Sequence, residues 1–122
     1  MSIVLDTGVF FRPALVRSLG HAKERVVVPA VVLAERARQM ARQGRPFSEL
    51  VGLIEDARFE IEPFGVAQAA AVAHAAPDDD AWRRHARDAM IAAYLRPGDV
   101  LWTTNPRDFL ALGVPAAAMR AV

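Results

Sequence analysis

The chain has 122 residues, of which 53% are hydrophobic and 24% are charged, and its formal net charge is +1. This is enough apolar material for one core, so we expect a single folded domain over residues 1–122. The lack of cysteine excludes disulfides, thiolate catalysis and cysteine-ligated metal centres. The chain shows no signal-peptide pattern and no apolar run near the roughly 20 residues of a membrane span. We therefore expect a soluble, cytoplasmic protein.

Three short apolar runs have the composition of parallel strands that are covered on both faces. They are residues 3–5, 26–28 and 100–102. Residues 59–62 alternate between apolar and acidic side chains, which predicts an edge strand with two solvated glutamates. The alanine-rich end, around residues 117–122, is a candidate for a fifth strand.

Helical spacing of apolar residues separates these strands. The predicted helices cover residues 13–22, 29–43, 46–57, 66–76 and 81–95, with a short one after Pro106. Asp80, the last residue of a run of three aspartates, is the predicted N-cap of the helix over 81–95. The resulting order, βαβααβααβαβ, predicts an α/β fold with three α/β/α layers around a parallel sheet of four to five strands.

Four acidic residues stand at places that such a sheet brings to one edge. Asp6 follows the first strand, Glu35 lies on the helix after the second, and Asp88 and Asp108 precede and follow the fourth. A structural role is the alternative to metal binding. Asp6 could cap a turn, and Glu35 could pair with a neighbouring arginine such as Arg36 or Arg38. If they converge, an all-oxygen site without cysteine favours Mg²⁺ or Mn²⁺ and suits metal-assisted hydrolysis of phosphodiesters.

His85 precedes Asp88 by three residues and so lies on the same helix face. It could orient Asp88 or donate a proton, although an ordinary structural histidine is the commoner case. Among the fifteen basic residues only Lys23 is a lysine, and the rest are arginines. Arginine binds phosphate in a planar fork, which suits a polyanionic substrate, although genomic base composition explains such a bias equally well.

Four segments together resemble a known family. They are Val4-Leu5-Asp6-Thr7, the run from Val28 to Glu35, Asp88-Ala-Met-Ile-Ala-Ala, and Thr103-Thr-Asn-Pro-Arg-Asp-Phe109. In this order and spacing the sequence resembles the PIN-domain ribonucleases and, within them, the VapC-type toxins of toxin–antitoxin pairs. The resemblance extends over nearly the whole chain.

The resemblance implies particular roles for the site residues. Asp6, Glu35 and Asp88 would bind the metal, and Asp108 or Asn105 would complete the site. Thr7 and Thr103 would orient the carboxylates. An activated water would attack RNA phosphate, usually in a homodimer, and the C-terminal segment of an antitoxin would fill the groove.

Basic residues near the acids in sequence are predicted to guide the RNA backbone. They are Arg83, Arg84 and Arg87, or the set of arginines from Arg36 to Arg42, in which Arg36 directly follows Glu35. The chain departs from the family pattern at Gly8, where a serine or asparagine is frequent, so a supporting hydrogen bond is expected to be weaker there.

Two alternatives to the toxin stay open from the sequence. One is a catalytically silent PIN-like module that binds RNA or protein, and the other is a housekeeping RNA-processing nuclease. A phospho-receiver domain is disfavoured, because it would need an aspartate after the third strand and a lysine after the fifth. Here Pro63 and Phe64 follow the third strand, and Lys23 is the only lysine.

Overall fold

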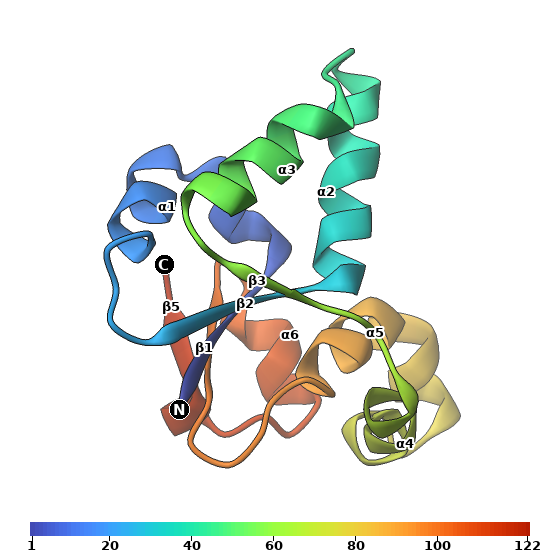
Figure 1. Cartoon of the computed structure of the whole chain (residues 1–122). Coiled ribbons are helices and arrows are strands. Elements are labelled where there is room, and N and C mark those ends of the chain that lie inside the picture. The colour runs from blue at the N-terminus through green and yellow to red at the C-terminus, as the bar shows by residue number, and fades with distance from the viewer.

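Five parallel strands form one sheet in the order β3-β2-β1-β4-β5 in the computed structural model, which describes residues 1–122 (Figure 1). The strands are β1 (Ser2–Leu5), β2 (Arg25–Pro29), β3 (Glu60–Glu62), β4 (Val100–Thr103) and β5 (Met119–Ala121). The predicted α/β fold with an all-parallel central sheet is therefore confirmed, and the alanine-rich end does supply the fifth strand.

Helices cover both faces of the sheet. They are α1 (Pro13–Leu19), α2 (Ala30–Arg42), α3 (Phe47–Asp56), α4 (Val66–Ala75), α5 (Asp79–Ala92) and α6 (Pro106–Ala111), with short 3₁₀ turns η1 (Thr7–Phe11) and η2 (Ala116–Ala118). The chain moves outward from β1 to β3, then crosses to β4 and continues to β5. Right-handed crossovers in these two directions place α1–α3 on one face and α4–α6 on the other, as Figure 1 shows. None of the helices combines the length and apolar character needed to cross a membrane.

The central strand β1 is buried along its whole length. Its Val4 lies opposite Val27 of β2 and opposite Leu101 of β4, so three apolar side chains meet in one row across the sheet. Continuous apolar runs are what a strand with helices on both faces requires, and this explains why the three sequence runs identified these strands.

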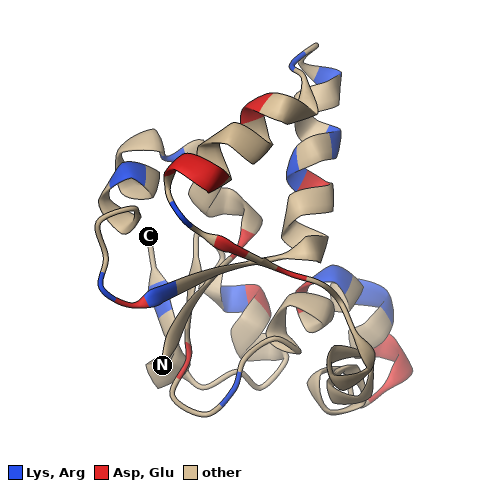
Figure 2. Ribbon diagram, viewed as in Figure 1, with Lys and Arg blue, Asp and Glu red and all other residues tan.

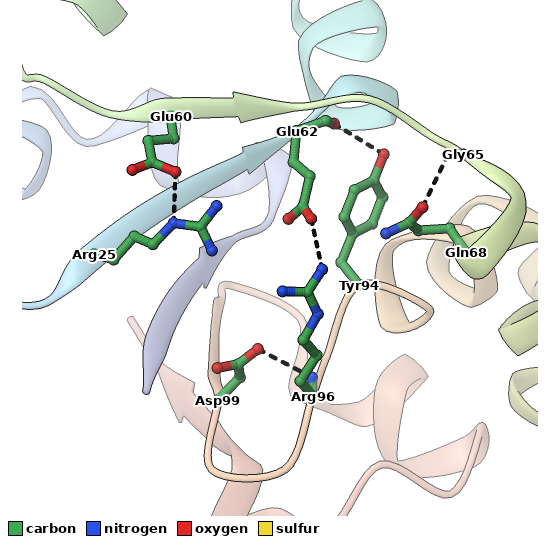
Figure 3. Close-up of polar contacts among 8 residues, drawn as sticks. All are labelled: Arg25, Glu60, Glu62, Gly65, Gln68, Tyr94, Arg96 and Asp99. Atoms are coloured by element: carbon green, nitrogen blue, oxygen red, sulfur yellow. Dashed lines mark hydrogen bonds and ion pairs between the residues drawn. The ribbon is translucent and has the colours of Figure 1, made fainter.

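The edge strand β3 is short and polar, and ion pairs tie it to the rest of the sheet (Figure 3). Arg25 pairs with Glu60, and Arg96 Nη2 lies 2.9 Å from Glu62 Oε1. The Tyr94 hydroxyl donates to the Glu62 backbone carbonyl at 3.1 Å. The prediction of two solvated glutamates was therefore wrong for Glu62, whose side chain is only 19% exposed because the α5–β4 connection packs against it.

Helix α5 differs from its predicted form in two respects. Asp78, not Asp80, is its N-cap, because the Asp78 carboxylate accepts a hydrogen bond from the Ala81 backbone N–H at 2.8 Å. The helix is also interrupted at His85, whose backbone angles are φ −133° and ψ 29°. The break separates the arginine-rich start of the helix from the half that carries Asp88 and packs on the sheet.

The strand order reverses between β1 and β4, since β1 leads outward to β2 while β4 lies on its other side. At this point the connections leave β1 and β4 toward opposite faces of the sheet. A crevice at the carboxyl ends of the strands is expected at such a point, and it is where open α/β sheets bind their ligands.

Candidate metal centre

Asp6 is the first residue after β1 and lies at the reversal point, 9% exposed. Its two carboxylate oxygens are both fixed by hydrogen bonds. The Thr7 backbone N–H donates to Oδ1 at 2.8 Å, and the Thr103 hydroxyl donates to Oδ2 at 2.7 Å. The carboxylate is thus held in one orientation by the ends of two neighbouring strands, β1 and β4.

Thr103 ends β4 and is fully buried. Its hydroxyl oxygen accepts a hydrogen bond from the Asn105 backbone N–H at 2.9 Å while its proton goes to Asp6. A hydroxyl has only one proton, so accepting from Asn105 leaves that proton free for the carboxylate. This places Thr103 as a support for Asp6, as the resemblance implied.

Glu35 lies on α2, and its side chain is 17% exposed. Sequence reasoning expected it to pair with Arg36 or Arg38 or to face a cation. Its partner is instead Arg87 of α5, whose Nη1 lies 2.9 Å from Glu35 Oε2. Burial raises the pKa of Glu35, the Arg87 charge and the Thr7 hydroxyl oppose this, and the Asp6 carboxylate adds to it. Asp6 and Glu35 are therefore close enough to affect one another.

Asp88 lies on the second half of α5 and is the most perturbed acid in the chain. Burial raises the pKa of Asp88 to about 6, and repulsion from the carboxylates of Asp6, Asp108 and Glu35 contributes, while His85 opposes the shift. The His85 ring Nδ1 lies 3.8 Å from Asp88 Oδ2. Asp88 is thus close enough to all three of the other predicted acids for their charges to raise its pKa, and Asp108 is the acid that shares a tight group with it.

Asp108 lies in the first turn of α6, where the helix dipole favours a negative charge. The Asn105 side-chain amide donates to Asp108 Oδ2, so Asn105 orients Asp108 rather than replacing it in the cluster. Ligand atoms of Asp108, Asp88 and His85 all lie within 4.8 Å of one another. These three residues form the tightest group of potential metal ligands in the chain. The group includes His85, for which the sequence favoured a structural role.

The donor set fits a hard divalent cation. Four carboxylates converge, while the only cationic side chain bonded to them is Arg87, with His85 beside Asp88. The Thr7 hydroxyl is buried near enough to Glu35 to lower the pKa of that carboxyl, yet it makes no hydrogen bond of normal geometry. Carboxylate oxygens with uncompensated negative charge are the ligands that Mg²⁺ and Mn²⁺ prefer. Asp6, Glu35, Asp88 and Asp108 are the residues that could hold such an ion.

Gly8 departs from the family pattern for a steric reason. A Cβ atom added to Gly8 would lie 2.0 Å from the Thr104 hydroxyl oxygen and 3.0 Å from the Thr104 Cβ. The turn after β4 therefore rests directly on the backbone of η1, next to the Thr103–Asp6 hydrogen bond. The glycine permits this close approach, and the expectation that it merely weakens a hydrogen bond misses this role.

Arg36, Arg83, Arg84 and Arg87, each predicted to guide RNA, lie in different surroundings. Arg87 contacts Glu35, Arg83 is exposed without an ion pair, and Arg84 pairs with Asp80 at 3.3 Å. Arg36 is only 7% exposed, and its guanidinium stacks over the Phe11 ring, 4.6 Å from the centroid. The prediction for Arg36 was wrong, because this residue lies on the inner face of α2 together with Val32 and Met40.

The chain is similar to a known protein family over most of its length. A family profile described as "PIN domain" matches residues 3–111, which includes all four carboxylates. PIN domains are generally metal-dependent nucleases, so the match supports hydrolase activity and metal binding. No curated protein matches the chain.

Proposed function

Since this chain belongs to the PIN-domain family, we propose that it is an endoribonuclease that depends on Mg²⁺ or Mn²⁺. The observation that carries the proposal is the position of Asp88. Burial, together with repulsion from the nearby carboxylates of Asp6, Asp108 and Glu35, raises the pKa of Asp88 to about 6. Such repulsion is costly in a structural cluster, whereas a divalent cation would relieve it.

The carboxylates of Asp6, Glu35, Asp88 and Asp108 would hold the ion. When bound, a divalent cation supplies an acidic water and stabilises negative charge on the phosphate. The chain contributes the orientation of these ligands. Thr103 and the Thr7 N–H fix both oxygens of Asp6, and Asn105 fixes Asp108. If water attacks phosphorus and the 3′ oxygen leaves, the products carry 5′-phosphate and 3′-hydroxyl ends.

We further propose that the protein is the toxin of a toxin–antitoxin pair and acts as a homodimer. The small size of the chain and its resemblance to VapC-type toxins, which are usually homodimers, support both parts of this proposal. Besides the carboxylate site, a groove of about 430 Å³ between α1, α2 and α3 offers a second surface for an antitoxin segment, with Phe10, Phe11 and Leu50 in its lining beside charged residues such as Arg17 and Glu49. Induced expression should arrest bacterial growth, and Asp88→Asn should abolish the arrest. Growth that continues unchanged would remove the toxin role.

Incubation of the purified protein with total RNA tests the nuclease. Cleavage is expected with Mg²⁺ or Mn²⁺, with 5′-phosphate ends on the products, and EDTA should abolish it. Asp6→Asn and Asp88→Asn should each reduce the rate by orders of magnitude. Asp79→Asn, an exposed aspartate on the same helix as Asp88, is the matched control and should cut normally. Cleavage that persists in EDTA would exclude the metal mechanism.

A further inference from the structure

A polar pocket of about 390 Å³ lies beside the carboxylate cluster, between α2 and α5. Its charged lining consists of Arg38, Arg42 and Arg87, with Glu35 as the only acid. The pocket therefore has a net positive charge and lies immediately next to the carboxylate cluster, whose net charge is negative. Figure 2 shows the blue segments of α2 and of α5 on the same side of the molecule.

The spacing along α2 explains this lining. Glu35, Arg38 and Arg42 are three and four residues apart and so lie on one face of the helix. Seven residues of helix rise about 10 Å, so the two arginines lead away from Glu35 in a row. Arg87 reaches the same face from α5, because its guanidinium is bonded to Glu35. The three arginines thus form a positively charged path that begins at the carboxylate cluster and follows α2 away from it.

The arginines of this row are available to a ligand. Arg38 and Arg42 are exposed and form no ion pair, whereas Arg45 pairs with Glu49 and Arg84 with Asp80. An arginine without a carboxylate partner keeps its planar set of donors for phosphate. Two free guanidinium groups on one helix face, held near a third, form a site for an anion that extends past the carboxylates.

We propose that the pocket formed by Arg38, Arg42 and Arg87 binds a backbone phosphate of the RNA strand, adjacent to the phosphate that is cleaved. The proposal rests on the nuclease function proposed above and adds a location for the substrate. The carboxylate cluster repels an RNA strand, so attraction must come from neighbouring groups. This pocket provides it at the point where a strand leaving the cluster crosses α2.

Binding of a short, fluorescently labelled single-stranded RNA, measured by anisotropy in EDTA at several salt concentrations, tests the pocket. Arg38→Ala/Arg42→Ala should weaken binding at least about tenfold, since two positive charges and their hydrogen bonds to phosphate are lost. The salt dependence should become shallower by about 0.7 for each lost phosphate contact. The double variant leaves Arg87 and its bond to Glu35 intact. Arg38→Lys/Arg42→Lys, which keeps the charges, should retain the salt slope of the wild type.

Arg17→Ala is the matched control, because Arg17 is exposed, lies on α1 away from the pocket and has no predicted role in RNA binding. If Arg38→Ala/Arg42→Ala binds RNA no worse than this control, the pocket assignment is wrong, even where the wild type cuts RNA. If the wild type cuts no RNA with Mn²⁺ but the double variant shows the expected loss, the pocket stands and the catalytic proposal fails.

A neutral methylphosphonate placed at single positions in the RNA identifies the phosphate. It should weaken binding to the wild type at one or two positions next to the cleaved bond and have no further effect on Arg38→Ala/Arg42→Ala. Equal sensitivity of both proteins at every position would overturn the proposal. If the double substitution weakened the binding of polyglutamate but not that of RNA, the pocket would instead be a site for an acidic peptide, and the proposal would be wrong.

Discussion

Arg87 joins α5 to α2 through a hydrogen bond from its Nη1 to Glu35 Oε2, 2.9 Å long. The two partners are exposed to very different degrees, since the Arg87 side chain is 70% exposed and that of Glu35 is 17%. The guanidinium can therefore leave for solvent at low cost, whereas the carboxylate stays buried and needs another cation. Arg87 is thus positioned as an exchangeable counter-ion of a proposed metal ligand.

Removing this counter-ion should strengthen metal binding. Arg87→Ala is expected to raise the Mn²⁺ affinity by up to about fivefold at pH 8, because a partly exposed ion pair of about 0.2–1 kcal/mol no longer competes with the metal. Calorimetric titration of the metal-free protein measures the affinity. Arg83→Ala, on the same helix but without an ion pair, should leave it unchanged. A weaker Mn²⁺ affinity in Arg87→Ala would show that Arg87 supports the site instead.

Neutralising Asp88 should stabilise the metal-free protein. Asp88→Asn removes a half-buried charge that three nearby carboxylates repel, so the melting temperature should rise by several degrees. The stabilisation that Mn²⁺ gives to the wild type should largely disappear, because a ligand stabilises only to the extent that it binds the native state. Thermal melts with and without Mn²⁺ measure both effects. A less stable variant with an undiminished Mn²⁺ shift is the result that contradicts this site.

The stability of the metal-free protein should depend on pH through Asp88. Its pKa is about 6 in the folded chain and about 3.9 when unfolded, so the native state holds more protons between these values. The free energy of unfolding should therefore fall as the pH rises from about 4 to 6, by up to about 3 kcal/mol, and stay level above that range.

Asp88→Asn isolates this contribution, because the other acids titrate in both proteins. The difference in unfolding free energy between wild type and variant, from urea titrations across this range, should shrink toward pH 4 and be largest above pH 6. Mn²⁺ affinity of the wild type should rise with pH up to about 6, since protons compete for the carboxylate. A difference that does not vary with pH would mean that Asp88 is an ordinary exposed acid.

Two glycines should respond to alanine in opposite directions. Gly8→Ala places a methyl group against the Thr104 side chain and should cost about 1–3 kcal/mol through overpacking. Gly52→Ala lies within α3, meets no atom within 4 Å, and should gain about 0.5–1 kcal/mol. Adding Thr104→Gly to Gly8→Ala should restore part of the lost stability. Urea denaturation measures all four proteins, and equal stability of the two alanine variants would contradict the proposed close approach.

The sequence determined the order of the elements and which strands are buried. Residues 3–5, 26–28 and 100–102 are continuous apolar runs, and only strands with helices on both faces require this pattern. The same order placed Asp6, Glu35, Asp88 and Asp108 near one edge of the sheet, and the structure brings them together there. Local patterns suffice for these features because each depends on residues a few positions apart.

Tertiary structure alone decided which charged residue pairs with Glu35. Glu35 pairs with Arg87, which is 52 residues away in sequence, although Arg36 and Arg38 are its near neighbours on α2. Which partner a helical side chain meets depends on what packs against its face of the helix. Arg36 lies on the inner face of α2, where its guanidinium stacks on the Phe11 ring. The approach of Thr104 to Gly8 has the same origin. Such contacts depend on how α2, α5 and the turn after β4 are placed relative to one another. Packing of the whole domain fixes this placement, and the spacing of residues along the sequence does not reveal it.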